Sequence, residues 1–482
     1  MLFTEPLFLF LFLPALLGLT FVRRSHGAYA NWVLVVASVV FYGVGGGWFT
    51  LLMLASILFN YRMAILVDRA REKASGRRAL VVAVAVNLAV LMLFKYANFA
   101  AANLNGVLDA LGGLPISLPH VLLPIGISFY TFHAISYVVD VYRGDASAQK
   151  QPVHAALYLL LFPQLIAGPI IRYREIADQL ARRVVGLDDF AAGVRRFVVG
   201  LGKKMLVANI VAVPADRIFA MPSAELSPAH AWLGITCYTL QIYFDFSGYS
   251  DMAIGLGRMF GFRFPENFRW PYVAETVQEF WRRWHITLSA WFRDYLYVPL
   301  GGNRGSRART YANMVTVFFL CGLWHGASWT FVFWGLFHGA FLVLERLGLA
   351  AFVKRLPRPL RHAYLLLVVM VGWVFFRAET LPQAWAFLQA MAGQTPSAPT
   401  PYLVSWYLTP ELWMALVTAV IAAMPVGPTL AAWRDRLVND TRQPAVAWGA
   451  AAVSVVSLLL VLALSIVQVA AQTYNPFIYF RF

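Results

Sequence analysis

The sequence predicts an all-α, polytopic membrane protein. Of its 482 residues, 60% are hydrophobic and only 13% are charged, whereas soluble domains carry about 25% charged residues. Apolar runs with almost no charge recur from one end of the chain to the other, and a helix needs about 20 such residues to cross a bilayer. These observations exclude an ordinary soluble enzyme and a disordered protein. They predict a single integral-membrane domain over residues 1–482.

Each apolar run is a candidate membrane helix. Several runs are short or interrupted by Gly and Pro, so we expect about 11 to 13 transmembrane or re-entrant helices. Irregular backbone at membrane depth has to be buried in protein or line a wet cavity, and the middle of the chain has this character. The candidate segments are roughly 5–22, 30–46, 48–67, 79–95, 121–142, 153–171, 193–213, 231–257, 311–325, 328–346, 362–376, 411–425 and 446–470.

Basic residues set the expected orientation. The 39 Lys and Arg exceed the 23 Asp and Glu, and we assign this excess to inner loops by the positive-inside rule rather than to nucleic acid. The run Leu7–Val22 is followed, not preceded, by Arg23 and Arg24, which predicts a retained first span with its N-terminus outside. Two further spans, joined at Gly45–Gly47, return the chain to a second basic loop, 69–78. The polar, basic stretches at 172–192 and 353–361 are expected inner loops, and Thr395–Pro410 is an expected loop.

Two carboxylates lie inside a candidate span. Asp245 and Asp251 sit among aromatic and hydroxyl side chains between Tyr243 and Leu256. Because ionisable residues at membrane depth are costly, each is a hypothesis for a functional site. Two interpretations stay open: a polar cavity or a helix-breaking pocket wall, or carboxylates that are satisfied by nearby arginines or backbone N–H groups at a broken helix end.

A second polar window runs from Glu279 to Asp294. On one continuous helix its polar residues would form a stripe facing away from a tryptophan-rich stripe. The helix could lie at the interface with its basic face toward lipid headgroups, or the stripe could hold an anionic donor or acceptor. The residues of the stripe are Arg282, His285, Ser289 and Arg293.

A histidine deep in an apolar run is the sharpest chemical signal. His325 follows Trp324, and Gly322 and Gly326 flank the pair closely enough to let a substrate approach. Histidine titrates near neutral pH, so His325 can act as a general base, although a satisfied core histidine is the alternative. His338 would not share its face on one unbroken helix, so packing suits it better.

Covalent and metal chemistry have little support. Cys321 lies one helical turn before His325 and could act as an acyl carrier, but an apolar-facing cysteine usually behaves as a small hydrophobe. With Cys237 as the other cysteine, neither a disulfide framework nor a metal motif can be argued. The motifs of nucleotide hydrolysis, zinc proteolysis and serine hydrolases are absent from the sequence.

Several segments, in order along nearly the whole chain, resemble the membrane-bound O-acyltransferase (MBOAT) family, and within it the alginate O-acetyltransferase type. The matching segments are Leu91–Asn98, Leu123–Tyr130, Asp140–Gly144, Gln164–Pro169, Tyr243–Leu256, Glu279–Leu300, Gly301–Gly305, Leu323–Gly326 and Gly372–Arg377.

This resemblance implies a ring of helices around a central tunnel, with an MBOAT core at roughly 120–380. It implies that His325 is the signature catalytic histidine and His285 the second motif histidine. Acetyl-CoA would be the donor, with no bound cofactor or metal. A backbone N–H near Gly326, or His285, could stabilise the oxyanion. The residues expected to contact the donor or substrate are Arg282, Arg283, Arg293, Asp245, Asp251, Trp324 and Ser289, the arginines being suited to phosphates.

The expected setting is a multi-pass protein of the bacterial inner membrane. The chain would work with periplasmic polysaccharide acetyltransferase proteins and pass acetyl groups toward a polysaccharide acceptor, directly or indirectly. Other polymers, such as cellulose or peptidoglycan, and D-alanyl transfer remain alternatives. Outside this class, a transporter or flippase would also have broken helices and intramembrane charges, and a scaffold that recruits a soluble transferase is a third alternative.

Overall fold

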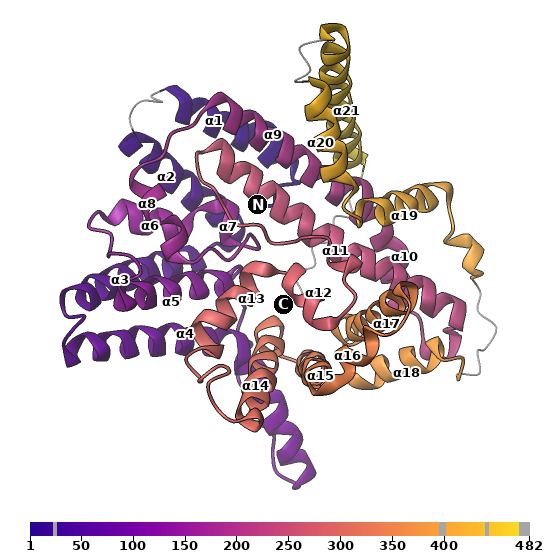
Figure 1. The fold of residues 1–482 in the computed structure, drawn as a ribbon. Helices are drawn as coiled ribbons and strands as arrows, with labels where there is room; N and C mark the ends of the chain where they lie inside the picture. The colour runs from indigo at the N-terminus through magenta and orange to yellow at the C-terminus, as the bar shows by residue number, and fades with distance from the viewer. Residues whose placement is uncertain (23–26, 395–401, 439–442, 472–482) are drawn as a thin grey trace.

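The computed structural model describes residues 1–22, 27–394, 402–438 and 443–471, and this part of the chain is helical without a strand (Figure 1). The expected all-α class is therefore confirmed. Arg23 and Arg24, on which the first inner loop depends, lie outside the described residues, as does 395–401 of the expected loop 395–410.

The helices vary widely in length. They are α1 Leu13–Val22, α2 Gly27–Gly46, α3 Phe49–Arg69, α4 Ala74–Ala110, α5 Ile127–Arg143, α6 Pro152–Leu160, α7 Phe162–Leu165, α8 Tyr173–Ala181, α9 Leu187–Gly202, α10 Asn209–Phe219, α11 Pro228–Met259, α12 Val277–Arg283, α13 Ile286–Phe292, α14 Arg307–His325, α15 Trp329–Leu344, α16 Ala350–Val353, α17 Arg358–Arg377, α18 Leu381–Met391, α19 Pro410–Ala422, α20 Val426–Val438 and α21 Pro444–Ala471. Short π-helical segments lie at Phe8–Phe12, Lys203–Ala208, Arg293–Tyr297 and Glu345–Leu349, and 3₁₀ turns at Ser223–Glu225, Pro271–Val273 and Val404–Trp406.

Seven of the described helical segments are long and apolar enough to cross a membrane, or eight if the pair α19 and α20, bent by 72°, forms one span. This number is smaller than the expected 11 to 13 because that range also included short and interrupted segments, and because α11, although unbroken, is not among the seven. Segment 153–171, for example, forms only the short helices α6 and α7. Part of 172–192, expected as a loop, forms α8 and the start of α9.

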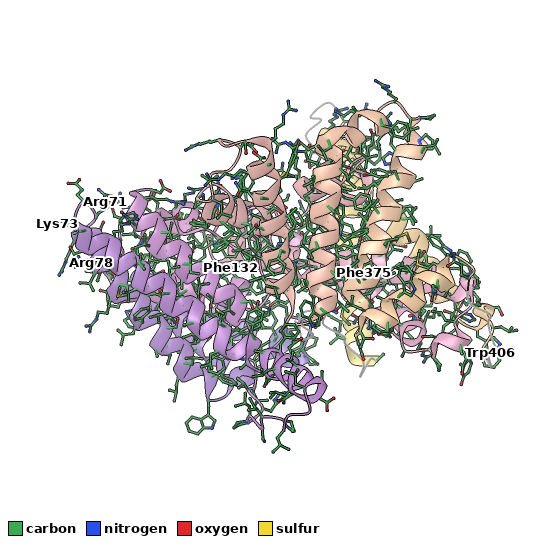
Figure 2. All side chains as sticks on the ribbon, turned by 90° about the horizontal axis from the view of Figure 1, so that it is seen from below. Arg71, Lys73, Arg78, Phe132, Phe375 and Trp406 are labelled. Carbon is green, nitrogen blue, oxygen red and sulfur yellow. The ribbon has the colours of Figure 1, made fainter. Side chains whose placement is uncertain are left out.

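The long helices are arranged around short ones. Figure 1 shows α2 to α6 gathered on one side of the molecule, α15, α17 and α18 on the other, and α12 and α13 in the middle. The hairpin between α3 and α4 places Arg71, Lys73 and Arg78 together at one end of the molecule, far from Trp406 at the other (Figure 2). These basic residues are exposed, in keeping with their expected place in an inner loop.

The centre of the structure depends on the close packing of α9 against α11. Glycines face each other at two levels of this pair, Gly193 opposite Gly255 and Gly200 opposite Gly248. A Cβ atom added to Gly200 would come within 2.6 Å of the Gly248 carbonyl oxygen and 2.7 Å of the Met252 backbone nitrogen. Small residues allow this approach, which is how membrane helices associate when lipid is as apolar as their side chains.

Gly200→Ala should therefore destabilise the protein by about 1–3 kcal/mol, the range for overpacking a closely packed core. The measurement is thermal unfolding of the purified protein in detergent. Gly449→Ala is the matched control, because a Cβ atom there meets nothing within 4 Å. Equal unfolding temperatures for the two variants would contradict this account of the contact.

Candidate active site

His325 is the last residue of α14, where the helix stops inside the protein. Gly326 leaves the helix with extended backbone, at φ −166° and ψ 148°. The His325 side chain is buried, and its ring meets Trp334 and Phe376 edge to face, at centroid distances of 5.0 and 5.2 Å. The imidazole thus lies in an aromatic surround rather than at a protein surface.

The flanking glycines serve helix packing. A Cβ atom on Gly322 would lie 2.3 Å from the Phe331 carbonyl oxygen, and one on Gly326 would lie 2.1 Å from the Phe331 ring. Both glycines therefore let α15 come against the end of α14, and the expectation that they open space for a substrate is wrong. The Gly326 N–H donates to the Gly322 carbonyl at 3.2 Å, so its bond is already made within the helix end.

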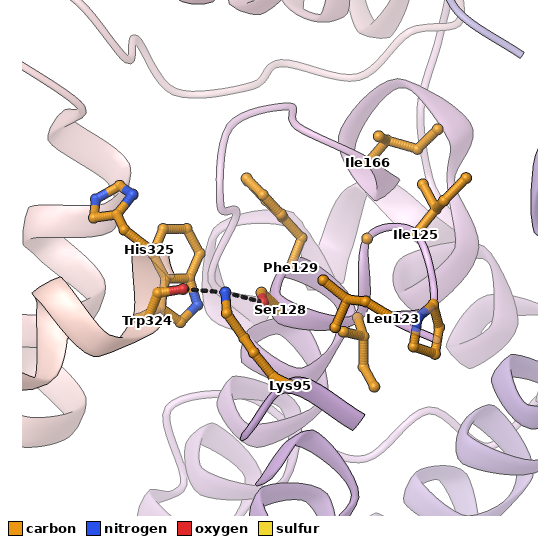
Figure 3. Close-up of a pocket in the computed structure, with 11 residues that line it drawn as sticks. Lys95, Leu123, Ile125, Ser128, Phe129, Ile166, Trp324 and His325 are labelled. Carbon is orange, nitrogen blue, oxygen red and sulfur yellow. Dashed lines mark hydrogen bonds between the residues drawn. The ribbon is translucent and has the colours of Figure 1, made fainter. Parts of the chain in front are cut away.

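Two consecutive residues of α4 hold the end of α14. The last carbonyls of a helix lack partners within it, and here the Tyr96 hydroxyl donates to the Leu323 carbonyl at 2.6 Å. The Lys95 ammonium donates to the next carbonyl, that of Trp324, and to the Ser128 hydroxyl at 3.1 Å (Figure 3). The backbone just before His325 is therefore fixed by a neighbouring membrane helix.

A cavity of about 130 Å³ opens beside His325 (Figure 3). Its wall combines the two basic side chains, His325 and Lys95, with the Ser128 hydroxyl and with apolar groups such as Phe129. A second cavity of about 200 Å³, near Tyr42 and the end of α2, shares the wall residues Ile125 and Ile166 with the first. His325 thus lines a cavity, and a second cavity adjoins the first.

His285 lies at a break between two short helices. It adopts a left-handed conformation, φ 44° and ψ 52°, between α12 and α13. This conformation is uncommon for residues other than glycine. The single continuous helix expected over 279–294 is therefore wrong. The start of α12 is held by the Glu345 carboxylate, which accepts from the backbone N–H groups of Val277 and Gln278 at 2.6 and 2.9 Å.

Asn267 fixes the tautomer of His285. The Asn267 Oδ1 atom accepts from the Thr287 backbone N–H at 3.3 Å and lies 3.0 Å from His285 Nδ1. Because the backbone N–H can only donate, the atom facing it is the amide oxygen, so His285 Nδ1 must carry the proton. The Nε2 atom then keeps its lone pair, and it is buried with no hydrogen-bond partner among the described residues.

Trp324 lies next to both histidines. Its ring centroid is 4.9 Å from that of His325 and 6.3 Å from that of His285. The indole also stacks on the Phe132 ring, with 5.3 Å between the ring centroids, and this contact holds it in place. The structure therefore brings the three predicted site residues His325, His285 and Trp324 into one aromatic cluster.

The other candidate residues of this window do not join the cluster. Arg283, a predicted donor-binding residue, pairs with Glu279 at 2.7 Å, and the hydroxyl of the stripe residue Ser289 donates to the Trp281 carbonyl at 3.4 Å. Arg282 is exposed. The break at His285 separates these side chains onto two helices, so no continuous basic stripe forms.

Arg293 belongs to a network of charges outside the candidate spans. It pairs with Asp294 at 2.7 Å, and Arg172 and Arg174 bind the same carboxylate. Burial alone would raise the pKa of Asp294, but the Arg293 hydrogen bond and the charges of the three arginines hold that pKa below its ordinary value. Asp294 therefore stays ionised and ties the segment after α13 to the start of α8.

The two intramembrane carboxylates are ion-paired. Asp251 lies 2.6 Å from Arg196 and 2.7 Å from Lys203, and Asp245 lies 2.7 Å from Lys204. Both sit on α11, which runs unbroken from Pro228 to Met259. The structure supports the interpretation of satisfied carboxylates, and the broken helix considered there is wrong.

Cys321 and His338 are buried packing residues. Cys321 is a free, buried cysteine one turn before His325. The His338 ring packs edge-on against Trp281 and Trp334 at 5.1 and 5.3 Å, and neither ring nitrogen has a hydrogen-bond partner among the described residues. This arrangement agrees with the packing role expected for His338.

Two residues that contact the site, Lys95 and Asn267, were not predicted from the sequence. Lys95 is the only charged residue between Arg78 and Asp109, so the rule that intramembrane charges mark function could have found it. Asn267 carries no such signal, because its contact with His285 arises only from the fold.

Comparison with known proteins defines the class. A sequence model of the membrane-bound O-acyltransferase family matches residues 35–380. The chain therefore belongs to this family: it is a multi-pass membrane O-acyltransferase.

Among individual relatives, the chain is 43% identical to a probable alginate O-acetylase AlgI of Azotobacter vinelandii and 41% identical to one of Pseudomonas aeruginosa, in both cases over 100% of each chain. It is 36% identical to a peptidoglycan O-acetyltransferase of Helicobacter pylori, over 82% of this chain and 80% of the relative.

If Asn267 orients His285, Asn267→Ala should lower the acyl-transfer rate by about 10- to 100-fold, the effect found when partners that orient metal-bound histidines are removed. The measurement is the acyl-transfer rate of Asn267→Ala, of His285→Ala and of the double variant Asn267→Ala/His285→Ala. The double variant should be no slower than His285→Ala, because residues that act as a unit are not additive. Full additivity would contradict the assignment.

Proposed function

We propose that the protein moves an acetyl group from a cytoplasmic donor, acetyl-CoA, toward hydroxyl groups of an exported polysaccharide such as alginate. The observation that carries the proposal is the cavity bounded by His325 in a chain of this acyltransferase family. The choice of acetyl and alginate rests on the full-length relatives named alginate O-acetylases. We place the protein in the bacterial inner membrane, with the periplasm as the acceptor side.

In the proposed mechanism His325 is the general base. It takes the proton of the accepting hydroxyl while the hydroxyl oxygen attacks the thioester carbonyl carbon and forms the new C–O bond. The carbonyl electron pair moves onto oxygen and then returns as the C–S bond breaks. The thiolate leaves and recovers the proton from His325. The aromatic surround of His325 keeps water away from the thioester, which limits its hydrolysis.

His285 has a complementary role in this mechanism. Its Nε2 lone pair can accept a hydrogen bond from a second hydroxyl group of the acceptor and so orient the acceptor, because Nδ1–H is held by Asn267. The reacting hydroxyl donates its one proton to His325. In this tautomer Nε2 has no proton to donate, so the neutral ring is not suited to stabilise the oxyanion. Trp324, in contact with both histidines, would form an apolar wall beside the reacting groups.

The donor's phosphates require basic residues. Arg282 is the best placed of the three predicted arginines, because it is exposed and no ion pair to it is found among the described residues. Arg283 and Arg293 would have to exchange their bonds to Glu279 and Asp294 for bonds to phosphate. Asp245, Asp251 and Ser289 support the helices rather than the donor in this account.

We further propose that the chain works in a complex. Among the described residues, the helices after α14 continue as membrane and connecting segments with no soluble unit that could bind a polymer. Separate periplasmic acetyltransferase proteins would then complete the transfer to the polysaccharide.

A second acceptor is favoured by a specific observation. The peptidoglycan O-acetyltransferase of Helicobacter pylori matches 82% of this chain at 36% identity, so peptidoglycan is the main alternative polymer. A D-alanyl transfer role has weaker support, since the Bacillus subtilis teichoic acid D-alanyltransferase matches only 46% of the chain at 28% identity. Family membership favours acyl transfer over a transporter, a flippase or a passive scaffold.

The catalytic proposal predicts that His325→Gln abolishes transfer of labelled acetyl from acetyl-CoA while the protein still inserts and folds. Glutamine can keep hydrogen bonds but cannot act as a base, and a positioned base contributes about 10²–10⁴-fold. His338→Gln is the matched control, because it replaces a buried histidine outside the cavity. Comparable loss in both variants would contradict the role of His325.

The acceptor proposal is tested by expressing the chain in cells that lack their own acetylase of this type. Acetyl ester should appear on the exported polysaccharide and not on peptidoglycan, as measured by mass spectrometry of both polymers. If acetyl ester appeared on peptidoglycan alone, the proposal of an exported polysaccharide as acceptor would be wrong, and peptidoglycan would be the acceptor.

A further inference from the structure

Lys95 is a buried basic residue in the wall of the cavity. Its side chain is only 7% exposed on α4, yet its two hydrogen bonds go to neutral groups, the Trp324 carbonyl and the Ser128 hydroxyl. No carboxylate among the described residues forms an ion pair with it. Lys204, by contrast, is 3% exposed and pairs with Asp245 at 2.7 Å. An ionisable side chain at membrane depth without an ion-pair partner is costly, so Lys95 is a candidate functional residue.

The two oxyanion donors expected from the sequence do not serve this role. The Gly326 N–H is bonded to the Gly322 carbonyl, and neutral His285 presents a lone pair at Nε2. Acyl transfer needs a donor aimed at the carbonyl oxygen that becomes negative. Lys95 lines the same cavity as His325, beside the Trp324 indole N–H and the Ser128 hydroxyl, and it is the basic donor of the three.

The hydrogen bonds of Lys95 leave capacity for this task. A lysine ammonium has three N–H donors, and two of them point to Trp324 and Ser128 (Figure 3). These two bonds fix the nitrogen at the cavity wall and leave the third N–H for a group in the cavity. A fixed donor needs no reorganisation when charge develops, which is what makes such stabilisation effective.

We propose that Lys95 is a catalytic residue whose ammonium donates a hydrogen bond to the acyl carbonyl oxygen and stabilises its negative charge in the tetrahedral intermediate. This role rests on the acyl transfer at His325 proposed above. The negative charge that balances Lys95 is then supplied by the reaction itself, as the carbonyl electron pair moves onto oxygen. Lys95 takes no proton and breaks no bond.

The test compares the purified full-length variants Lys95→Gln and Tyr96→Phe in transfer of labelled acetyl from acetyl-CoA. Tyr96→Phe removes the neighbouring bond to the end of α14 but leaves the charge in place. We expect Lys95→Gln to lower kcat by about 10²–10³-fold, the effect of removing one oxyanion donor. KM for acetyl-CoA should stay within about twofold, because the lost interaction belongs to the transition state. Tyr96→Phe should lose less than about tenfold of kcat, since no oxyanion donor is removed.

Two further variants complete the test. Lys95→Arg keeps a cation and should retain more activity than Lys95→Gln, and Lys95→Met replaces the glutamine variant if that protein does not fold. A wild-type kcat in Lys95→Gln or Lys95→Met, or an equal loss in Lys95→Gln and Tyr96→Phe, would overturn the proposal and leave Lys95 as a structural clamp. If the wild-type protein itself transfers no acetyl from acetyl-CoA, the proposed function fails instead, so the two failures are distinguishable.

Discussion

Backbone groups at helix ends that are buried inside the protein must find hydrogen-bond partners there, and the arrangement of the site follows from this requirement. α14 ends at His325, and its last carbonyls are bonded by Lys95 and Tyr96 of α4. α13 begins after His285, and the Ile286 backbone N–H donates to the Asn267 carbonyl at 2.9 Å. The partners that satisfy these helix ends are therefore the same segments that surround the two histidines. The hydrogen bonds that satisfy the two helix ends therefore also fix the positions of the two histidines.

This constraint also separates two kinds of buried charge. Asp245 and Asp251 on the continuous helix α11 are neutralised by Lys204, Lys203 and Arg196, and they hold helices together. Lys95, in the middle of α4, contacts the end of α14 beside a cavity and has no ion-pair partner among the described residues. The contrast explains why burial of a charge alone does not identify a functional residue, whereas burial without compensation at a cavity does.

The sequence predicted the helical class and the membrane setting, because long apolar runs are local features. It also singled out His325, His285 and Trp324, which the structure brings into one aromatic cluster, and their catalytic roles stay predictions. The break at His285 was missed, since the helical periodicity around it continues across a left-handed residue. The contact of Asn267 with His285 and that of Lys95 with Trp324 join distant segments, so no local pattern could reveal them.

We place acyl transfer at the cavity bounded by His325 and Lys95. The experiment is a structure of the full chain bound to a non-reactive ketone analogue of acetyl-CoA. We expect the analogue's carbonyl to lie in that cavity, with its carbon next to His325 and its oxygen within hydrogen-bond distance of the Lys95 side-chain nitrogen. Density for the carbonyl elsewhere, with the cavity unoccupied at saturating analogue, would contradict it.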